Sequence, residues 1–183
     1  MPEEKWRVLQ EATVGHDDFL EVRRGDYEVP GGKHIEGFWT FRERDSVHIA
    51  AVTPERELLL VRQYRLGPDA FLYECPAGFL EDGETDPLER ARRELHEETG
   101  SQSERWHALG VFHETVNRMR KTCYCFLALD ARQVAEQELD STEAVQFERM
   151  PLAEVRRMVR DGEITAANTL ALLCKAMLFM EAL

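Results

Sequence analysis

Three glutamates gather on one face of the helix predicted between residues 87 and 99. Glu94, Glu97 and Glu98 fall within an arc of about 100° when each residue is turned by about 100° from the last. Carboxylates this close repel one another and weaken an isolated helix. A divalent cation with oxygen ligands would offset that repulsion, so the spacing favours a metal site. The alternative interpretation is a solvated acidic face on which Arg93 pairs with Glu97.

The ends of this helix are marked by residues that favour helix termini. Asp86 is the expected N-cap, Pro87 the first helical residue, and Glu89 the partner that completes a capping box. Gly100 is the expected stop. The helix also carries an apolar stripe that can pack against a core, formed by Leu88, Ala91 and Leu95.

The turn and helix together resemble the Nudix box, in which Gly and Glu precede an Arg-Glu pair and then a Glu-Glu pair. Here the pattern is Gly78, Glu84 and Arg93-Glu94-Leu95-x-Glu97-Glu98-x-Gly100. Eight residues rather than the usual seven separate Glu84 from Arg93, and Ser101 occupies a position that is usually apolar. The additional residue lies near Thr85, ahead of the helix cap, so the register of the helix is unchanged.

Further segments resemble one branch of this family, the ADP-ribose and nucleoside-diphosphate-sugar pyrophosphatases. They are Val61–Arg65, Glu74–Gly78 and Asp161–Thr165. The resemblance implies an α/β fold, a Nudix-type α/β/α sandwich with a mixed sheet and a small N-terminal β-rich subdomain. Residues 1–46 would then serve dimerisation and base binding, and residues 47–183 would form the Nudix hydrolase domain.

The resemblance also implies a metal site and a set of catalytic groups. The metal ligands would be the backbone carbonyl of Ala77 and the carboxylates of Glu94, Glu97 and Glu98, holding Mg²⁺ or alternatively Mn²⁺. The catalytic residues would be Glu98, Glu94 and Glu143, and which glutamate acts as the base stays open.

Substrate contacts are implied at several other positions. Arg65 would hold a phosphate or the ribose, with Glu74 beside it, and Phe38 or Trp39 would stack on the base. The loop Glu114–Lys121 lacks the proline usual in relatives that prefer ADP-ribose and carries three basic residues. It is interpreted either as a phosphate-binding collar, with Arg118 as a substrate contact, or as a solvated loop.

The expected reaction is Mg²⁺-dependent hydrolysis of the pyrophosphate bond in a nucleoside diphosphate linked to a sugar or similar group. The products would be a nucleoside monophosphate and a sugar phosphate. A hydrolase of nucleoside triphosphates, dinucleoside polyphosphates or RNA caps is the main alternative. A non-catalytic nucleotide-binding regulator is a weaker one, because such a protein has no need of the full glutamate set.

Composition restricts the partners. The formal net charge of −12 argues against a nucleic-acid-binding surface and against anionic membranes. The four cysteines have no zinc-site spacing, and no apolar run is long enough to span a membrane. A cytoplasmic enzyme acting on a small nucleotide, most simply as a homodimer, is the expectation.

The remaining pattern predicts strands alternating with helices, hence a mixed sheet covered on both faces. In the N-terminal part, short strands are expected at residues 6–9, 19–23, 27–29 and 35–41. The main domain is expected to have strands at residues 47–52, 58–65, 71–75, 106–113, 122–129 and 144–147. A helix is predicted from Leu152 to Arg160, and a last helix is predicted with Thr165 as its cap.

Overall fold

A computed structural model describes residues 4–139 and 144–182 of the chain. The chain divides into two compact units. The first unit contains the described residues up to Arg44 together with His113–Thr122, and the second contains Asp45–Phe112 and the described residues from Cys123 onward. The sequence predicts a first domain of residues 1–46 and a second of residues 47–183. In the structure the segment 113–122 belongs to the first unit instead.

The first unit is a four-stranded sheet in the order β1-β2-β3-β10. Its strands are β1 (Arg7–His16), β2 (Leu20–Val29), β3 (Lys33–Glu43) and the short β10 (Met119–Arg120). The first three strands pair antiparallel, whereas β10 runs parallel to β3. The four short strands expected in this region therefore form three long ones, and the loop after β9 supplies the fourth strand of the sheet.

Aromatic rings and a partly exposed ion-pair network hold the first unit together. Tyr27 is buried. Its ring packs against the Trp6 ring in a tilted arrangement with centroids 6.1 Å apart, and against the Phe38 ring edge to face with centroids 5.9 Å apart. Glu11 accepts hydrogen bonds from Arg120, Tyr27 and Arg23. The Arg120 guanidinium is the largest cause that lowers the pKa of Glu11 from 4.5 to about 2. Glu11 therefore stays ionised in the folded unit at neutral pH.

The second unit is built on a seven-stranded mixed sheet in the order β13-β5-β4-β11-β9, with β6 beside β5 and β7 beside β4. Among the described strands of this sheet, only β4 and β11 pair parallel. The strands are β4 (Ser46–Val52), β5 (Glu57–Arg65), β6 (Ala70–Glu74), β7 (Ala77–Phe79), β9 (Arg105–Phe112), β11 (Cys123–Leu129) and β13 (Gln146–Pro151). A two-stranded sheet pairs β8 (Ser101–Gln102) with β12 (Arg132–Gln133).

The described residues of this unit also form three helices: α1 (Pro87–Thr99), α2 (Leu152–Arg160) and α3 (Ala167–Glu181). Two predictions about its elements are wrong. The last strand is Gln146–Pro151 rather than 144–147, because its partner β5 extends the pairing to Glu57. Thr165 does not cap α3, since the N-cap residue is Ala166 and no side chain caps that end.

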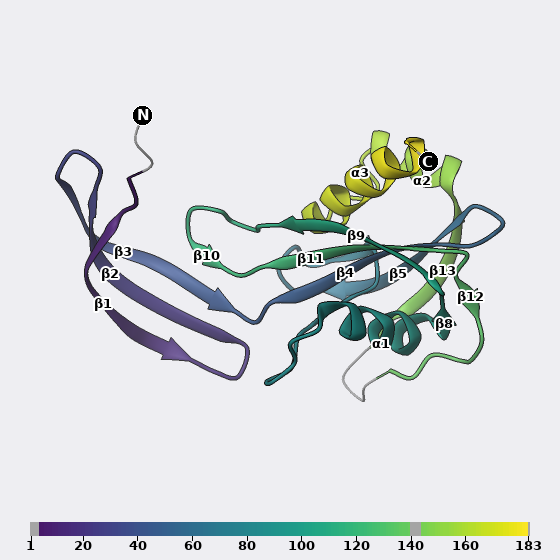
Figure 1. Cartoon of the computed structure of the whole chain (residues 1–183), viewed down its shortest axis with the longest axis horizontal. Helices are drawn as coiled ribbons and strands as arrows, with labels where there is room; N and C mark the ends of the chain where they lie inside the picture. Colours follow the sequence, from purple (N-terminus) through teal and green to yellow (C-terminus); the bar gives the residue numbers. More distant parts are fainter. Residues whose placement is uncertain (1–3, 140–143, 183) are drawn as a thin grey trace. The chain divides into compact units, whose positions relative to one another are not determined.

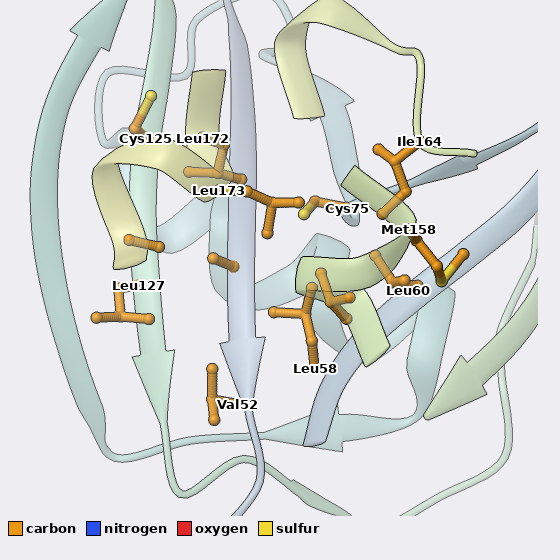
Figure 2. Close-up of a cluster of buried hydrophobic side chains, with 13 residues drawn as sticks. Val52, Leu58, Leu60, Cys75, Cys125, Leu127, Met158, Ile164, Leu172 and Leu173 are labelled. Carbon is orange, nitrogen blue, oxygen red and sulfur yellow. The ribbon is translucent and has the colours of Figure 1, made fainter. Parts of the chain in front are cut away.

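The helices cover both faces of the sheet, as Figure 1 shows. On one face, buried residues of α1 pack with Val47, Ile49 and Phe126. On the other face, α2 and α3 pack over a cluster that includes Leu58, Leu60, Cys75 and Leu127 (Figure 2). Every residue of β4 is buried, which is expected for a central strand covered on both sides. The α/β fold with a mixed sheet between helices is confirmed.

None of the helices within the described residues is both long and apolar enough to cross a membrane.

Candidate active site

Helix α1 begins and ends where the sequence predicts. Asp86 is the N-cap, and its Oδ1 accepts hydrogen bonds from the backbone N–H groups of Leu88 and Glu89 at 2.9 and 3.4 Å. Gly100 ends the helix in the left-handed conformation with φ of 63°, and its N–H donates to the carbonyl of His96 at 2.7 Å. Local sequence signals therefore fix both the length and the register of the glutamate-bearing helix.

Packing fixes the rotation of α1 about its axis. Ala91 and Leu95 are completely buried against the sheet in the same cluster as Val47 and Ile49. Because Glu94 and Glu98 lie beside this stripe, they are carried inward with it. Their exposed fractions are only 5% and 4%, whereas Glu97 is half-buried.

The two buried carboxylates lie against β7 and the turn before it. The backbone N–H of Ala77 donates to Oε2 of Glu98 at 3.1 Å. A Cβ atom placed on Gly78 would overlap the carboxylate of Glu94, so glycine is required for this close approach. The structure thus brings together Glu94, Glu98 and the Ala77 backbone from positions well apart in the sequence.

An ion pair lies at one side of this cluster. Arg90 pairs with Glu94 on the same helix and with Glu81 at 3.0 Å, and its side chain is 13% exposed. Sequence reasoning did not select Arg90 as a site residue. Its position four residues before Glu94 is a detectable signal, because residues at that spacing face one another on a helix.

A second carboxylate and arginine lie where β5 and β6 pair. Arg65 donates through Nε to Oε2 of Glu74 at 2.6 Å, and Glu74 is buried while the Arg65 side chain is 44% exposed. Between Glu74 and Ala77, burial and the negative charges of Glu74 and Glu98 raise the pKa of the Cys75 thiol well above its usual range. Cys75 is therefore held as a neutral thiol and is unsuited to act as a nucleophile.

The donor set around β7 fits a hard divalent cation. All candidate ligands are oxygens: the structure brings the carboxylates of Glu94 and Glu98 to the Ala77–Gly78 backbone, whereas Glu97, the third predicted carboxylate ligand, is half-buried on the same helix and its place in the site stays a prediction. Mg²⁺ and Mn²⁺ prefer such oxygen donors, whereas the adjacent Cys75 is neutral and offers no thiolate. The glycine at position 78 provides the room that the buried Glu94 carboxylate occupies.

Comparison with known proteins identifies the family. The NUDIX domain family matches residues 42–173. The chain belongs to the Nudix family. It is 29% identical over 169 residues to an ADP-ribose pyrophosphatase of Bacillus subtilis (strain 168), covering 89% of this chain and 90% of that protein. It is also 29% identical over 166 residues to a "CMP-5'-(N-acetyl-N-hydroxy-3-aminopropyl)phosphonate hydrolase" of Streptomyces rubellomurinus, covering 90% and 79%.

A solved structure agrees on the fold. The chain superposes on one described as an "ADP compounds hydrolase" with a TM-score of 0.81 and 22% identity, over 98% of this chain and 96% of the other. The expected resemblance to the ADP-ribose pyrophosphatase branch is confirmed. The chain is a Nudix pyrophosphohydrolase, and enzymes of this family generally use a divalent metal ion.

The insertion in the Nudix box does not separate its first glutamate from its arginine. Arg93 forms an ion pair with Glu84. Glu84 also accepts a hydrogen bond from the N–H of Glu81 at 2.8 Å, and its own N–H donates to the carbonyl of Glu81 at 3.1 Å. The extra residue is therefore accommodated in the loop before Asp86, and the two ends of the box stay connected.

The aromatic candidates lie in the first unit. Phe38 lines a cavity of about 400 Å³ together with Trp6, Tyr27 and Arg120. Trp39 is 39% exposed, and the Arg24 guanidinium lies 5.7 Å from its ring centroid. A cavity of this size lined by aromatic rings is suited to a planar ligand group. The expected base-stacking roles of Phe38 and Trp39 stay predictions.

The basic residues of the Glu114–Lys121 loop have partners within the first unit. Arg118 lies over the Phe38 ring at 4.2 Å and donates to the carbonyl of Trp39 at 2.7 Å. Lys121 pairs with Glu43 at 3.0 Å and with Glu114 at 3.4 Å. The Arg118 side chain thus lies over the ring of one aromatic candidate and donates a hydrogen bond to the backbone carbonyl of the other. A direct contact between Arg118 and the substrate stays a prediction.

The last catalytic candidate, Glu143, lies outside the described residues. Its assignment as a base rests on the resemblance alone.

Proposed function

We propose that this enzyme hydrolyses the diphosphate bond of ADP-ribose or a related nucleoside-diphosphate sugar, giving a nucleoside monophosphate and a sugar phosphate. The observation that carries the proposal is the buried pair Glu94 and Glu98 facing the Ala77–Gly78 backbone. The similarity to the ADP-ribose pyrophosphatase of Bacillus subtilis, which extends over 90% of that protein, supports the substrate class.

The chemistry divides between a metal ion and the protein side chains. Glu94, Glu97, Glu98 and the Ala77 carbonyl would hold Mg²⁺, with Mn²⁺ as a substitute, and the ion would supply Lewis-acid neutralisation of the diphosphate charge. Arg65 would hold a non-reacting phosphate oxygen, because the buried Glu74 fixes its Nε and so orients the planar guanidinium.

Hydrolysis also needs a group that accepts the proton of the attacking water. A carboxylate near the diphosphate suits that role, and Glu143 or one of the Nudix-box glutamates would serve. Base stacking on Phe38 or Trp39 and a contact from Arg118 would add recognition of the nucleoside. The Phe38-lined cavity of about 400 Å³ supports this part of the proposal.

A substrate comparison tests the proposed function. ADP-ribose, other nucleoside-diphosphate sugars, nucleoside triphosphates and dinucleoside polyphosphates are incubated separately with Mg²⁺ or Mn²⁺, and products are separated by chromatography. We expect the highest kcat/KM for an ADP-linked sugar, with AMP and a sugar phosphate as products, and no turnover in EDTA. A higher kcat/KM for a triphosphate, with release of pyrophosphate, would instead support the alternative nucleotide hydrolase.

We also propose that the enzyme is a homodimer joined through the first unit. Strand β1 is an edge strand, and exposed apolar side chains lie on or beside it, including Trp6, Val8 and Val14. A long edge strand with exposed apolar groups is a strong pairing surface unless it is covered.

Analytical ultracentrifugation measures this directly. At micromolar concentration the protein is expected to sediment at about twice its chain mass of 21.2 kDa. The double variant Val8→Glu/Val14→Glu is expected to sediment as a monomer. The control variant Lys33→Glu, which changes an exposed residue of the same sheet, is expected to remain a dimer. A monomeric wild-type protein would show that β1 is not a self-association surface.

A further inference from the structure

Residues Glu74–Gly78 are held by hydrogen bonds from three separate elements. The N–H of Ile49 on β4 donates to the carbonyl of Pro76 at 2.9 Å. The N–H of Ala77 donates to Glu98 on α1 at 3.1 Å. The N–H of Cys75 donates to Oγ1 of Thr169 on α3 at 3.2 Å. The first two bonds belong to the sheet and to the Nudix helix, and the third comes from a helix that the Nudix box does not include.

The Thr169 contact is completely enclosed. Thr169 and Cys75 are each 2% exposed, so water cannot replace the hydroxyl as a partner of the Cys75 N–H. The Cys75 side chain lies in the apolar cluster beneath α2 and α3, which also holds Leu172 and Leu173 (Figure 2). Because threonine is β-branched, its side chain has few rotamers, and its burial restricts it further. The hydroxyl is thus a rigid anchor for the backbone at Cys75.

We propose that Thr169 is a positioning residue of the metal site. Cys75 lies between Glu74, whose carboxylate orients Arg65, and Ala77, whose carbonyl is a proposed ligand. Cys75 is bonded directly to Glu74 and is separated from Ala77 by Pro76 alone, and consecutive Cα atoms stay about 3.8 Å apart, so a backbone shift at Cys75 displaces Glu74 and reaches Ala77 through one residue. Displacing a reacting group by about 1 Å can lower a rate by about 100-fold. Thr169 touches neither substrate nor metal, and the proposal rests on the proposed function of Glu94 and Glu98.

Two substitutions at Thr169 distinguish the effect of losing the hydroxyl from the effect of changing the shape of the side chain. Thr169→Val keeps the branched shape and removes the acceptor, whereas Thr169→Ser keeps the acceptor and removes only a methyl group. Mn²⁺ affinity is measured by calorimetry without substrate, and kcat and KM are measured with ADP-ribose. We expect Thr169→Val to weaken Mn²⁺ binding by about tenfold or more and to lower kcat more than it raises KM, with Thr169→Ser within about twofold of wild type.

A matched variant controls for general loosening of α3. Met177→Ala removes a partly buried side chain that packs against the same cluster two turns further along the helix. It should lower the thermal unfolding midpoint in EDTA without changing Mn²⁺ affinity. If Thr169→Val does not fold, Thr169→Ala takes its place as the variant without a hydroxyl, measured against the same control.

The possible outcomes are distinguishable. A Thr169→Val protein with a lower unfolding midpoint but wild-type Mn²⁺ affinity would mean that the hydroxyl is only a core contact, which overturns the proposal. Equal impairment in Thr169→Ser would overturn it as well, because the acceptor is retained there. If Glu98→Gln binds Mn²⁺ as tightly as wild type, the metal site itself is wrong, and the positioning role fails with it.

Discussion

Replacing Glu98 by glutamine is expected to lower kcat by at least about 100-fold while the protein stays folded, since a change even in the outer coordination shell typically costs 10- to 100-fold. Glutamine has nearly the same shape as glutamate, and its amide oxygen can still accept the hydrogen bond from the Ala77 N–H. The change removes one of two buried carboxylates on the same helix, so charge repulsion in the metal-free protein should fall. Steady-state kinetics at saturating Mg²⁺ and a thermal melt in EDTA measure the two effects separately.

Glu89→Gln is the matched control for this variant. Glu89 lies on the same helix but is exposed, and only its backbone N–H contacts the N-cap Asp86. We expect its kcat to equal that of the wild type within experimental scatter. Near-normal turnover of Glu98→Gln at saturating metal would remove Glu98 from the catalytic set, and equal losses in both variants would point to a general effect on the helix.

The helix and its glutamates could be predicted because their signals are local. Asp86, Pro87 and Gly100 lie within or next to the element that they delimit, and all three act as the sequence indicates. The spacing of Glu94 and Glu98 beside an apolar stripe likewise predicts that one side of the helix carries both packing and chemistry. The helical period of 3.6 residues is enough to predict which side chains share one face of such a helix.

The arrangement of the first unit could not be predicted in the same way. Strand β10 pairs with β3 across a long sequence separation, so no local pattern marks residues 113–122 as part of that sheet. The last helix shows the opposite failure. Thr165 has the residue type of a cap, but the helix begins at Ala167 after Ala166, and a cap preference is too small to override tertiary packing.

The proposed metal site is only half predictable from the sequence, for a related reason. Its helical half follows from spacing, but its other half is the backbone of residues 74–78, which meets Glu98 across 21 residues and Thr169 across 94. Resemblance to the Nudix family supplied Ala77, whereas nothing in the sequence indicated the hydroxyl of Thr169. Contacts between distant segments depend on the assembled fold, and a single sequence specifies them only through that fold.

Gly78→Ala is expected to lower kcat/KM by about 100-fold with little loss of stability, because it displaces a proposed metal ligand by about 1 Å or more. The added Cβ would overlap the carboxylate of Glu94. Gly78 is not among the residues with positive φ, so its backbone accepts alanine without strain. The carboxylate is the mobile end of its side chain and will move instead, away from β7 and from its place beside Ala77. Gly67→Ala, where a Cβ meets nothing within 4 Å, is the control and should retain full activity.

A double-mutant cycle decides whether Gly78 acts through Glu94. In a Glu94→Ala background the carboxylate is absent, so the Cβ of Gly78→Ala has nothing to displace. The second substitution should then change kcat/KM by less than about twofold, whereas the two losses would multiply if the residues acted independently. Thermal melts of all four proteins establish that each is folded. A full additional loss in the double variant would show that alanine at position 78 disturbs the Ala77 carbonyl or the substrate path, and the close approach of Gly78 to Glu94 would then not be the reason that glycine is needed there.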